Sequence, residues 1–491
     1  MVFKEDFMYI LNTKYKLKND IERILLISEQ HYGSQLYISF VHPVYAWILN
    51  QFDGKTTIKE IIDGIKNVLG LSDFEIEKVL APLINNPKEI VIQYDDVIST
   101  FPPFILVDNT ENRVRKKYKD GFFAAIKRVN HSRNRLFKPI NLLICPTLKC
   151  FTDCVYCYAN RYYKHEELDS DIWVKFINQA KHFGIEQIDV TGGEFFLKKG
   201  WKDIAKCLTC NGYFPDISTK IPLSHSTLED IKLMGLKSLQ FSIDTLSPSI
   251  AANTLNVDPQ YISKLKDTIT YAGEIGLKLI LKPTLTKYTC STNNVRSILE
   301  FADSLENMEK VVVSVIGHSC YKPQGLYMKI RPSLRQIVEV RSLLKDCSKE
   351  FLYHIQDDTF VYRYSEMRNK KIFEDRARCT ANVEGFVILP DGTATICEEL
   401  YWNEKFIIGN ITNETIPQIW MSPKALKLAS LGTKDIPIYS NCRLCEQLLE
   451  CHRKRGVCWK LIMSAYGMKY AFNPDPRCPK APIPNMLFTV D

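Results

Sequence analysis

The 491-residue sequence contains no apolar run long enough to cross a lipid bilayer. Its first sixteen residues, MVFKEDFMYILNTKYK, mix charged with apolar side chains and therefore lack the uninterrupted core of a secretory signal peptide. The sequence also has no low-complexity stretch and no repeat of the length found in solenoid proteins. These absences predict a cytoplasmic protein that has no membrane partner.

The sequence also lacks a strong excess of positively or negatively charged residues. The 64 basic and 56 acidic residues give a net charge of +8, which a nucleic-acid-binding surface could produce but which a mildly basic solvated surface explains better. With 45% hydrophobic and 24% charged residues, the composition is that of a folded protein. We therefore expect two to four globular domains and no nucleic-acid partner.

Residues 1–100 are expected to form a small α+β domain. Their hydrophobic pattern predicts two strands, three helices and a final strand, at residues 22–28, 35–40, 42–54, 56–70, 72–86 and 88–95. Such a unit could bind DNA, form a structural cap, or bind an extended peptide at an unpaired strand edge. Residues 101–137 begin with prolines and then become basic, so we expect a linker there.

The N-terminal pattern resembles the leader-peptide recognition domain of peptide-modifying systems, which implies a winged-helix-like fold for residues 1–100. The run WILNQFDGKTTIKEI, residues 47–61, carries this resemblance together with the order of the predicted elements. The resemblance implies that the partner of this domain is a ribosomally synthesised precursor peptide.

From residue 138 to residue 318, short apolar strands alternate with helices. The six expected strands lie at residues 140–144, 187–194, 214–219, 239–244, 277–285 and 310–317. Six βα units predict a parallel sheet covered by helices, in which functional residues gather at the carboxyl ends of the strands. Residues 319–375, with a charged helix near 333–352, are expected to bridge to the next domain.

Three cysteines follow the first of these strands, in the segment LKCFTDCVYCYANR. Cys150, Cys154 and Cys157 are three of sixteen cysteines, and in a reducing compartment these favour metal ligands or buried apolar residues over disulfides. A structural zinc ion needs four ligands, the fourth of which Cys145 could supply. A 4Fe–4S cluster held by three thiolates leaves one iron open. The spacing alone allows either site.

The C-x3-C-x2-C spacing after a first strand resembles the radical S-adenosylmethionine (radical SAM) family. This resemblance implies an α/β fold with a partial (β/α)6 barrel, and a 4Fe–4S cluster whose open iron binds the amino and carboxylate groups of S-adenosylmethionine. It also implies six residues that contact this cofactor: Tyr156, Gly192, Gly193, Glu194, Ser242 and Asp244.

These six residues are expected to have different roles. Tyr156 would pack on the adenine, although core packing is an alternative for this side chain. The two glycines would allow a close backbone approach, and Glu194 would accept a hydrogen bond from the methionine ammonium. Ser242 and Asp244 would contact the ribose or the carboxylate.

Seven further cysteines lie within residues 376–491, and their spacing resembles the SPASM extension of radical SAM enzymes. The resemblance implies two auxiliary 4Fe–4S clusters, hence three clusters in all, with a zinc ribbon as the alternative. The first auxiliary set is Cys379, Cys397 and Cys458, and the second set is Cys442, Cys445, Cys451 and Cys478. The first set lacks a fourth thiol, so one iron of its cluster would either stay open or take another ligand, such as Cys347.

Two further expectations concern single residues. Glu398 directly follows Cys397, where the resemblance to SPASM enzymes implies a catalytic carboxylate that accepts a substrate proton. A surface carboxylate is the alternative. The remaining six cysteines are expected to be buried small apolar residues: Cys145, Cys207, Cys210, Cys290, Cys320 and Cys347.

The function predicted from these resemblances is that of a radical SAM peptide maturase. It would abstract hydrogen from a precursor peptide and install an intramolecular cross-link, preferably a thioether, with an electron donor such as flavodoxin or ferredoxin. The alternatives are a carbon–carbon or ether cross-link and a formylglycine-type protein oxidation. The alternative from another class is a zinc-containing protein that binds nucleic acid.

Overall fold

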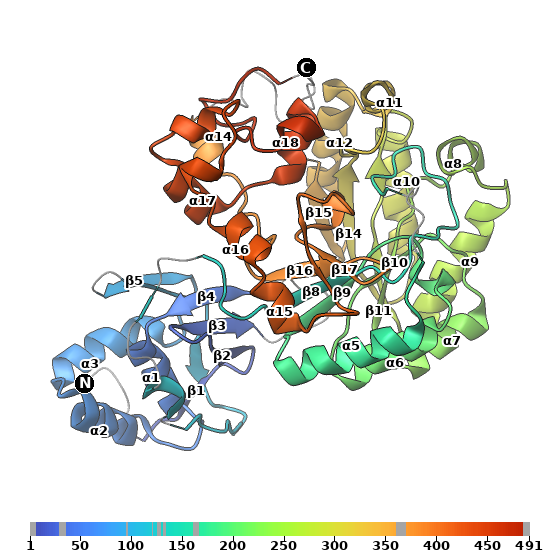
Figure 1. The fold of residues 1–491 in the computed structure, drawn as a ribbon. Helices are drawn as coiled ribbons and strands as arrows, with labels where there is room; N and C mark the ends of the chain where they lie inside the picture. The colour runs from blue at the N-terminus through green and yellow to red at the C-terminus, as the bar shows by residue number, and fades with distance from the viewer. Residues whose placement is uncertain are drawn as a thin grey trace. The chain divides into compact units, whose positions relative to one another are not determined.

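The computed structural model describes residues 6–28, 36–94, 97–119, 121–124, 129–130, 134–160, 166–359 and 370–484. The chain divides into two compact units, Met1–Lys138 and Pro139–Asp491 (Figure 1). Among the described residues, no helix is both long enough and apolar enough to span a bilayer.

The first unit is built on an antiparallel sheet in the order β2–β3–β4, with two smaller strand pairs, β5–β6 and β1–β7. Its strands are β1 (Tyr9–Leu11), β2 (Tyr15–Asn19), β3 (Ile24–Ser28), β4 (Ile38–Val41), β5 (Ile90–Tyr94), β6 (Val97–Phe101) and β7 (Leu106–Asp108). Its helices are α1 (Pro43–Gln51), α2 (Ile58–Leu69), α3 (Asp73–Leu80), the 3-10 turn η1 (Ala81–Leu83) and α4 (Gly121–Ala124). All three predicted helices are therefore present.

Helix α2 shows how the local sequence sets these elements. Thr57 and Glu60 exchange hydrogen bonds in a capping box at its start, and Gly70 ends it with a φ of 66°, a left-handed conformation that favours glycine. Ile61 and Ile65 lie one turn apart on its buried face. This face packs into the apolar core of the unit.

The structure differs from the expected linker at residues 101–137. Strand β7 pairs with β1, and the guanidinium of Arg115 donates hydrogen bonds to the backbone oxygens of Leu11, Asn12 and Tyr15 at 3.2, 3.0 and 2.7 Å. The basic composition suggested a solvated segment, whereas this arginine satisfies backbone carbonyls of the N-terminal strands. The segment therefore belongs to the first unit.

Arg23 is a buried cation at the turn between β2 and β3. Its side chain has no exposed surface; Nε lies 2.8 Å from Oδ2 of Asp20, and Nη2 donates to the carbonyl of Arg135 at 2.6 Å. The guanidinium also lies 4.4 Å from the ring centre of Phe40. Oδ1 of Asp20 accepts a hydrogen bond from the backbone N–H of Lys138 at 3.1 Å. The ion pair of Arg23 and Asp20 thus binds the last residues of the first unit, Arg135 and Lys138, beside its sheet.

Replacing Arg23 with methionine is expected to destabilise the first unit by about 3–5 kcal/mol, because it leaves the buried carboxylate of Asp20 without its partner. The measurement is hydrogen exchange of the β2–β4 backbone amides in the full chain. Arg335, whose side chain is 88% exposed in its pair with Glu339, is the matched control. The same substitution there should cost about 0–1 kcal/mol, and equal losses in the two variants would contradict the role of Arg23.

The second unit contains all six expected strands. β8 and β9 form one parallel pair, and β10, β11, β12 and β14 lie side by side in a parallel sheet in that order. These strands are β8 (Asn141–Ile144), β9 (Gln187–Val190), β10 (Ile217–Thr219), β11 (Ser238–Phe241), β12 (Lys278–Leu281) and β14 (Met308–Val315); β13 (Thr284–Leu285) also pairs with β14. The predicted α/β partial barrel is therefore confirmed.

Helices cover the outer side of this sheet (Figure 1). They are α5 (Ser170–Phe183), α6 (Trp201–Cys210), α7 (His225–Leu233), α8 (Pro248–Leu255), α9 (Tyr261–Glu274) and α10 (Thr292–Asp303), with the 3-10 turn η2 (Phe195–Leu197). Trp173 on α5 and Phe241 on β11 are fully buried in the apolar core between helices and strands.

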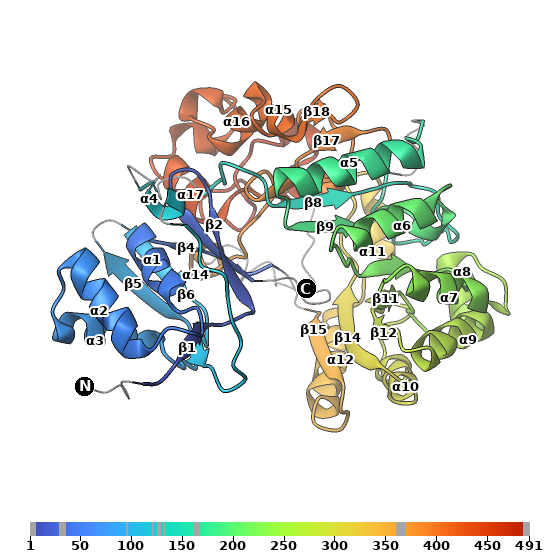
Figure 2. The same cartoon turned by 90° about the horizontal axis from the view of Figure 1, so that it is seen from below.

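In the described structure the barrel strands form two hydrogen-bonded sheets, and later parts of the chain extend each of them. β15 (His354–Asp358), within the expected bridging region, pairs parallel with β14 and lies beside it in both views (Figures 1 and 2). β16 (Gly385–Ile388) pairs parallel with β8 and leads into β17 (Thr393–Thr395) and β18 (Ile407–Asn410). The cysteine-rich region is thus hydrogen-bonded directly to the first barrel strand.

Further helices and 3-10 turns complete the second unit. The helices are α11 (Gln324–Ile330), α12 (Leu334–Cys347), α14 (Lys370–Glu374), α15 (Ile416–Trp420), α16 (Pro423–Ala429), α17 (Leu448–Arg455) and α18 (Trp459–Tyr466). The 3-10 turns are η3 (Glu398–Leu400), η4 (Thr433–Asp435), η5 (Asn441–Leu444) and η6 (Met468–Tyr470).

Candidate functional site

The three-cysteine loop follows β8 at the carboxyl end of the barrel. The hydroxyl of Thr152 lies between two of its thiols, 3.8 Å from Sγ of Cys150 and 3.1 Å from Sγ of Cys154. The backbone N–H groups of Asp153 and Val155 donate to carbonyls at the end of α8 at 2.9 and 3.0 Å. Burial raises the pKa of Cys154, so a metal bound here must displace the thiol proton.

The Gly-Gly-Glu turn after β9 packs directly against this loop. The N–H of Gly193 donates to the carbonyl of Thr147 at 2.9 Å, and the N–H of Glu194 donates to the carbonyl of Lys149 at 2.7 Å. A Cβ atom at Gly193 would lie 2.0 Å from that carbonyl oxygen, and Gly192 has a φ of +124°. Glycine is therefore required at both positions for the two loops to meet.

Glu194 is buried, with both carboxylate oxygens held at the end of β10. Oε2 accepts from the hydroxyl of Thr219 at 2.8 Å and Oε1 from the backbone N–H of Lys220 at 2.7 Å. Burial raises the pKa of Glu194 to about 7. A cationic partner would favour its ionised form, as expected for the acceptor of a methionine ammonium.

Lys220 joins the other expected cofactor residues, although the sequence analysis missed it. Its Nζ lies 3.0 Å from Oδ2 of Asp244 and donates to the carbonyl of Ser242 at 2.8 Å, while the hydroxyl of Tyr156 donates to the same Asp244 carboxylate. Burial alone would lower the pKa of Lys220, but the charges of Asp244 and Cys154 raise it. The signal that could have revealed Lys220 is its position directly after a barrel strand.

The second auxiliary set is brought together around one cavity. Cys442, Cys445, Cys451 and Cys478 all line a cavity of about 290 Å³. Burial, and then the charges of the other three thiols, raise the pKa of Cys442 to about 12, although a hydrogen bond with Ser440 acts in the opposite direction. Four cysteines around one such cavity fit a 4Fe–4S cluster, whose four irons each take one thiolate.

Within the described ranges, no three histidine, cysteine or acidic side chains are close enough to hold a single metal ion. Thiolates that bind separate irons of a cluster lie farther apart than the ligands of one ion.

The three cysteines of the first auxiliary set lie near one another, with Cys379 close to both of the others. Burial and then the neighbouring Cys379 raise the pKa of Cys458 to about 11, and the pKa of Cys397 is likewise raised by burial and by nearby acidic and thiol groups that include Cys379. The N–H of Cys379 donates to the carbonyl of Arg455 at 2.9 Å. A side chain at Gly456, where φ is +70°, would lie 2.9 Å from the carbonyl oxygen of Cys379. This close backbone approach places Cys379 beside the segment that leads to Cys458.

The structure places Cys347, the example of a fourth ligand, in the apolar core of the barrel. It is fully buried at the end of α12, where its thiol lies 3.8 Å from Nη1 of Arg296 on α10. An amphipathic helix directs this residue into the barrel core. Cys320 instead lies against α18, the helix that begins after Cys458, with Sγ 3.4 Å from the hydroxyl of Ser464.

The other expected structural cysteines differ in exposure. Cys145 and Cys290 are buried, as predicted, whereas Cys207 is partly exposed and Cys210 is exposed. The two exposed thiols lie on the outer helix α6, where the helical period places them towards solvent.

Glu398 lies at the mouth of the barrel, because the hydroxyl of Thr191, which follows β9, donates to its Oε2 at 3.1 Å. Burial, and then the charge of Glu399, raises the pKa of Glu398. Burial and then the carboxylate of Glu398 also raise the pKa of Tyr158, which lies one residue beyond Cys157. A carboxyl group with a raised pKa beside the cluster loop can accept a proton during a reaction there.

Two more polar residues at this mouth were missed in the sequence. Lys460 on α18 pairs with Glu399 at 2.9 Å, and His318, which follows β14, is 7% exposed. Neither ring nitrogen of His318 has a hydrogen-bond partner in the described structure. Burial and the charge of Lys460 lower the pKa of His318 to about 4, which keeps the imidazole neutral.

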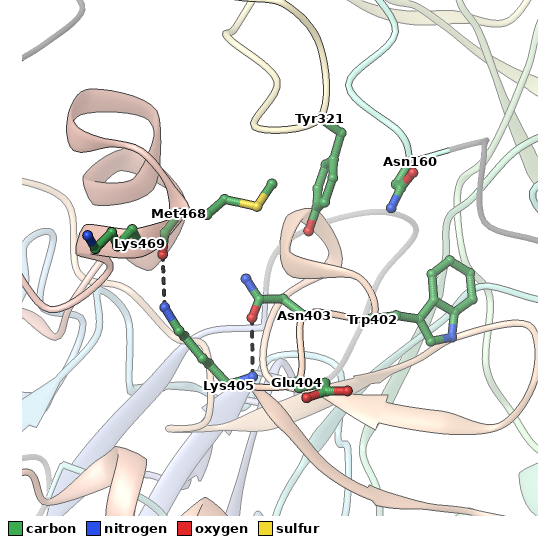
Figure 3. Close-up of a pocket in the computed structure, with 8 residues that line it drawn as sticks. All are labelled: Asn160, Tyr321, Trp402, Asn403, Glu404, Lys405, Met468 and Lys469. Carbon is green, nitrogen blue, oxygen red and sulfur yellow. Dashed lines mark hydrogen bonds between the residues drawn. The ribbon is translucent and has the colours of Figure 1, made fainter.

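A cavity of about 430 Å³ lies where the barrel meets the cysteine-rich region (Figure 3). Asn160 lines it from the loop after Cys157 and Tyr321 from the segment after β14. The residues that line it from the C-terminal part are Trp402, Asn403, Glu404, Lys405, Met468 and Lys469. The hydroxyl of Tyr321 donates to the carbonyl of Leu400 at 2.6 Å. This cavity therefore adjoins both the loop after Cys157 and the turn that carries Glu398.

Comparison with known protein families gives two matches along the second unit. Residues 144–289 match the Radical SAM superfamily, and residues 379–446 match the SPASM iron–sulfur cluster-binding domain. The matched segments include the three-cysteine loop, the Gly-Gly-Glu turn, and the turn from Cys397 to Glu398.

Among curated proteins, similar ones include two bacterial GTP 3′,8-cyclases. The protein from Nautilia profundicola is 24% identical over 253 residues, which cover 49% of this chain and 77% of that protein. The protein from Aliarcobacter butzleri is 26% identical over 265 residues, which cover 50% of this chain and 78% of that protein.

Among solved structures, Streptococcus suis SuiB is similar over nearly the whole chain. SuiB bound to S-adenosylmethionine matches with a TM-score of 0.63 and 15% identity over 97% of this chain and 100% of that one. SuiB bound to the precursor peptide SuiA matches with the same score and identity over 98% of this chain and 100% of that one. The likeness shows a shared fold.

The matched families agree with the site geometry. A radical SAM domain binds S-adenosylmethionine and a 4Fe–4S cluster, and a SPASM domain binds auxiliary iron–sulfur clusters. The cysteine loop beside the Gly-Gly-Glu turn fits the first, and the cysteines gathered behind the barrel fit the second. The chain is thus a radical SAM enzyme with a SPASM iron–sulfur domain.

Proposed function

We propose that this enzyme is a peptide maturase that abstracts hydrogen from a ribosomally made precursor peptide and installs an intramolecular cross-link. The preferred cross-link is a thioether. In this proposal Cys150, Cys154 and Cys157 hold the cluster that binds S-adenosylmethionine. Cys379, Cys397 and Cys458 hold one auxiliary cluster, and Cys442, Cys445, Cys451 and Cys478 hold the other. Bound together, S-adenosylmethionine and its cluster supply hydrogen-atom abstraction from an unactivated C–H bond.

The observation that carries this proposal is the position of Glu398 between the barrel mouth and the first auxiliary set. Closing a cross-link on a peptide carbon that has lost a hydrogen atom releases one proton and one electron. Glu398 is held by Thr191 beside the cluster loop and is placed to take the proton. Cys397, its neighbour in sequence, belongs to a cluster-binding set that supplies electron acceptance. Simple hydrolysis or group transfer would need neither feature.

The peptide class of substrate is supported by the first unit and by the fold comparison. In the described structure, β2 is an edge strand of the antiparallel β2–β3–β4 sheet, whereas β6 lies against β4. An extended peptide can add to such an edge through main-chain hydrogen bonds. The likeness to SuiB bound to its precursor peptide covers 98% of this chain, so it includes this unit. The first unit would hold the leader of the precursor while the segment to be modified enters the barrel.

The experiment that tests the function is co-expression of the chain with each short open reading frame encoded beside its gene, followed by mass spectrometry of the peptide. A cross-link is expected to appear as a loss of two hydrogen atoms, and tandem fragmentation will locate it. Alkylation with iodoacetamide separates the products, because a thioether consumes a cysteine thiol and a carbon–carbon or ether link does not. An aldehyde on an uncross-linked peptide would instead support the formylglycine-type oxidation. Unmodified peptides, together with active cleavage of S-adenosylmethionine, would contradict the maturase.

Removing the first unit is expected to separate peptide binding from cofactor cleavage. A chain of residues 139–491 should bind a labelled precursor peptide at least about tenfold more weakly, because the strand edge is lost. It should still form 5′-deoxyadenosine slowly without peptide, since the cofactor residues all lie in the second unit. Fluorescence anisotropy and chromatography measure the two quantities. Equal peptide affinity of the full and shortened chains would exclude the first unit as the leader-binding part.

A further inference from the structure

The barrel sheet has an apolar outer face and a polar inner face. Leu239 and Phe241 on β11 belong to the apolar core that the helices cover. Because side chains alternate along a strand, Gln240 and Ser242 point to the opposite side, which we call the inner face. There the side-chain amide of Gln240 donates to the hydroxyl of Ser218 on β10 at 2.7 Å, and this hydroxyl lies 3.2 Å from that of Ser242. The inner face therefore offers hydrogen-bonding groups to a bound molecule.

Lys282 lies on the inner face at the carboxyl end of β12. The side chain of Leu281, the last residue of β12, is in the apolar core, and the N–H of Lys282 continues the strand register by donating to the carbonyl of Phe241 at 2.9 Å. The lysine side chain therefore leaves the inner face at the mouth of the barrel. It is partly buried, and its ammonium forms no hydrogen bond or ion pair with any residue that the structure describes.

Two other lysines of the barrel show that this lack of a partner is particular to Lys282. Lys278, four residues earlier on the same face of β12, pairs with Glu309 at 3.5 Å. Lys220, among the expected cofactor residues, pairs with Asp244 at 3.0 Å. A cation that is partly removed from water gains from an opposite charge. Of these three lysines, only Lys282 lacks a carboxylate partner within the described residues.

Glu398 lies near Lys282 across the mouth of the barrel. Burial, and then the charge of Glu399, raise the pKa of Glu398, whereas the charge of Lys282 acts against them. The two side chains are thus close enough to interact through their charges, but they form no ion pair in the described structure. The hydrogen bond from Thr191 holds Glu398 instead. A peptide that brings its reacting carbon to Glu398 therefore also comes within reach of Lys282.

We infer that Lys282 is a specificity-determining residue, which binds a carboxylate of the precursor peptide beside the carbon that is modified. The inference rests on the proposed function and names the chemistry of its substrate: an aspartate or glutamate side chain close to the cross-linked residue. A lysine ammonium has three donors on a flexible stem, so it can follow a carboxylate as the peptide enters. The carboxyl terminus of the peptide offers the same chemistry from a second source. No covalent bond forms or breaks at Lys282.

The test uses the holoenzyme and the precursor peptide that co-expression identifies, together with copies of that peptide. In each copy one acidic side chain, or the carboxyl terminus, is replaced by its amide. Lys282→Met is expected to lower kcat/KM for the cross-linked product at least about tenfold, and one of the amide peptides should do the same with the unaltered enzyme. That peptide identifies the source of the carboxylate. Combining the two changes should cost no more than either alone, because each removes the same ion pair.

The matched control is Lys278→Met, which removes a lysine from the same face of the same strand. Its position is about 13 Å from that of Lys282 along β12, so kcat/KM should be unchanged. Lys282→Arg, which keeps the charge, should retain most of the activity. Without peptide, the affinity of Lys282→Met for S-adenosylmethionine and its slow formation of 5′-deoxyadenosine should equal those of the unaltered chain.

Three outcomes would overturn the role of Lys282. The first is a loss of affinity for S-adenosylmethionine in Lys282→Met, which would assign the lysine to the carboxylate of the cofactor. The second is an equal loss of kcat/KM in Lys278→Met. The third is a full rate with every amide peptide, a result that needs only the unaltered enzyme and so stands even if Lys282→Met fails to fold. In all three the unaltered chain still forms the cross-link, whereas failure of the proposed function leaves every peptide unmodified.

Discussion

Replacing Cys150, Cys154 and Cys157 together with alanine is expected to abolish cleavage of S-adenosylmethionine. The three residues are the thiols of the loop against which the Gly-Gly-Glu turn packs, and in our assignment they hold the cluster that binds the cofactor. The measurement is 5′-deoxyadenosine by chromatography after reduction with dithionite. The expected amount is the background of an enzyme-free mixture.

The matched control for this triple variant removes thiols that hold no cluster in our assignment. Cys207 and Cys210 also form a C-x2-C pair, but they lie on the outer helix α6. Their double alanine variant should retain cofactor cleavage. Circular dichroism confirms that both variants are folded. Persistent 5′-deoxyadenosine formation in the folded triple variant would refute the cluster assignment.

Replacing Glu398 with glutamine is expected to slow cross-link formation by about 10²–10⁴-fold, the usual contribution of a general base. Cleavage of S-adenosylmethionine should continue, because Glu398 does not hold the cofactor in this assignment. The ratio of 5′-deoxyadenosine to cross-linked peptide measures this uncoupling. Glu306→Gln, which alters an exposed carboxylate that precedes β14 and does not line the cavity, should leave the ratio unchanged.

The pH dependence of the same reaction gives an independent check. Burial and the charge of Glu399 raise the pKa of Glu398, and a base acts in its deprotonated form. The rate of cross-linking should therefore rise with pH through this raised pKa and level off above it. In Glu398→Gln this rise should be absent. A glutamine variant that keeps both the rate and the pH profile would remove Glu398 from the mechanism.

The barrel and its cysteines could be predicted because their signals are local in the sequence. Each barrel strand is a short apolar run, and the thiols of the loop lie within a single turn-rich segment. The strands β1 and β7 escaped prediction because each has three residues, too few to show a period of two. Their pairing joins segments from opposite ends of the first unit, and no local pattern encodes such a contact.

Residues whose role depends on neighbours from other strands could not be identified in advance. Lys220, His318 and Arg376 are single basic residues in the sequence. Only the fold shows that Lys220 lies beside Asp244, that the ring nitrogens of His318 have no hydrogen-bond partner in the described structure, and that Arg376 contacts the thiol of Cys451. Cys347 shows the opposite error, since counting thiols says nothing about the direction in which a helix points them. Spacing predicts which cysteines can act together, and packing determines which of them do.

The parallel pairing of β16 with β8 has a consequence for synthesis of the chain on the ribosome. One edge of β8 (Asn141–Ile144) finds its hydrogen-bond partners only in β16 (Gly385–Ile388). This edge therefore stays unpaired until most of the protein has been made. An unpaired strand edge invites pairing with other chains. A nascent or truncated product that stops after β14 should therefore self-associate, and fragments for crystallisation need to extend through β18.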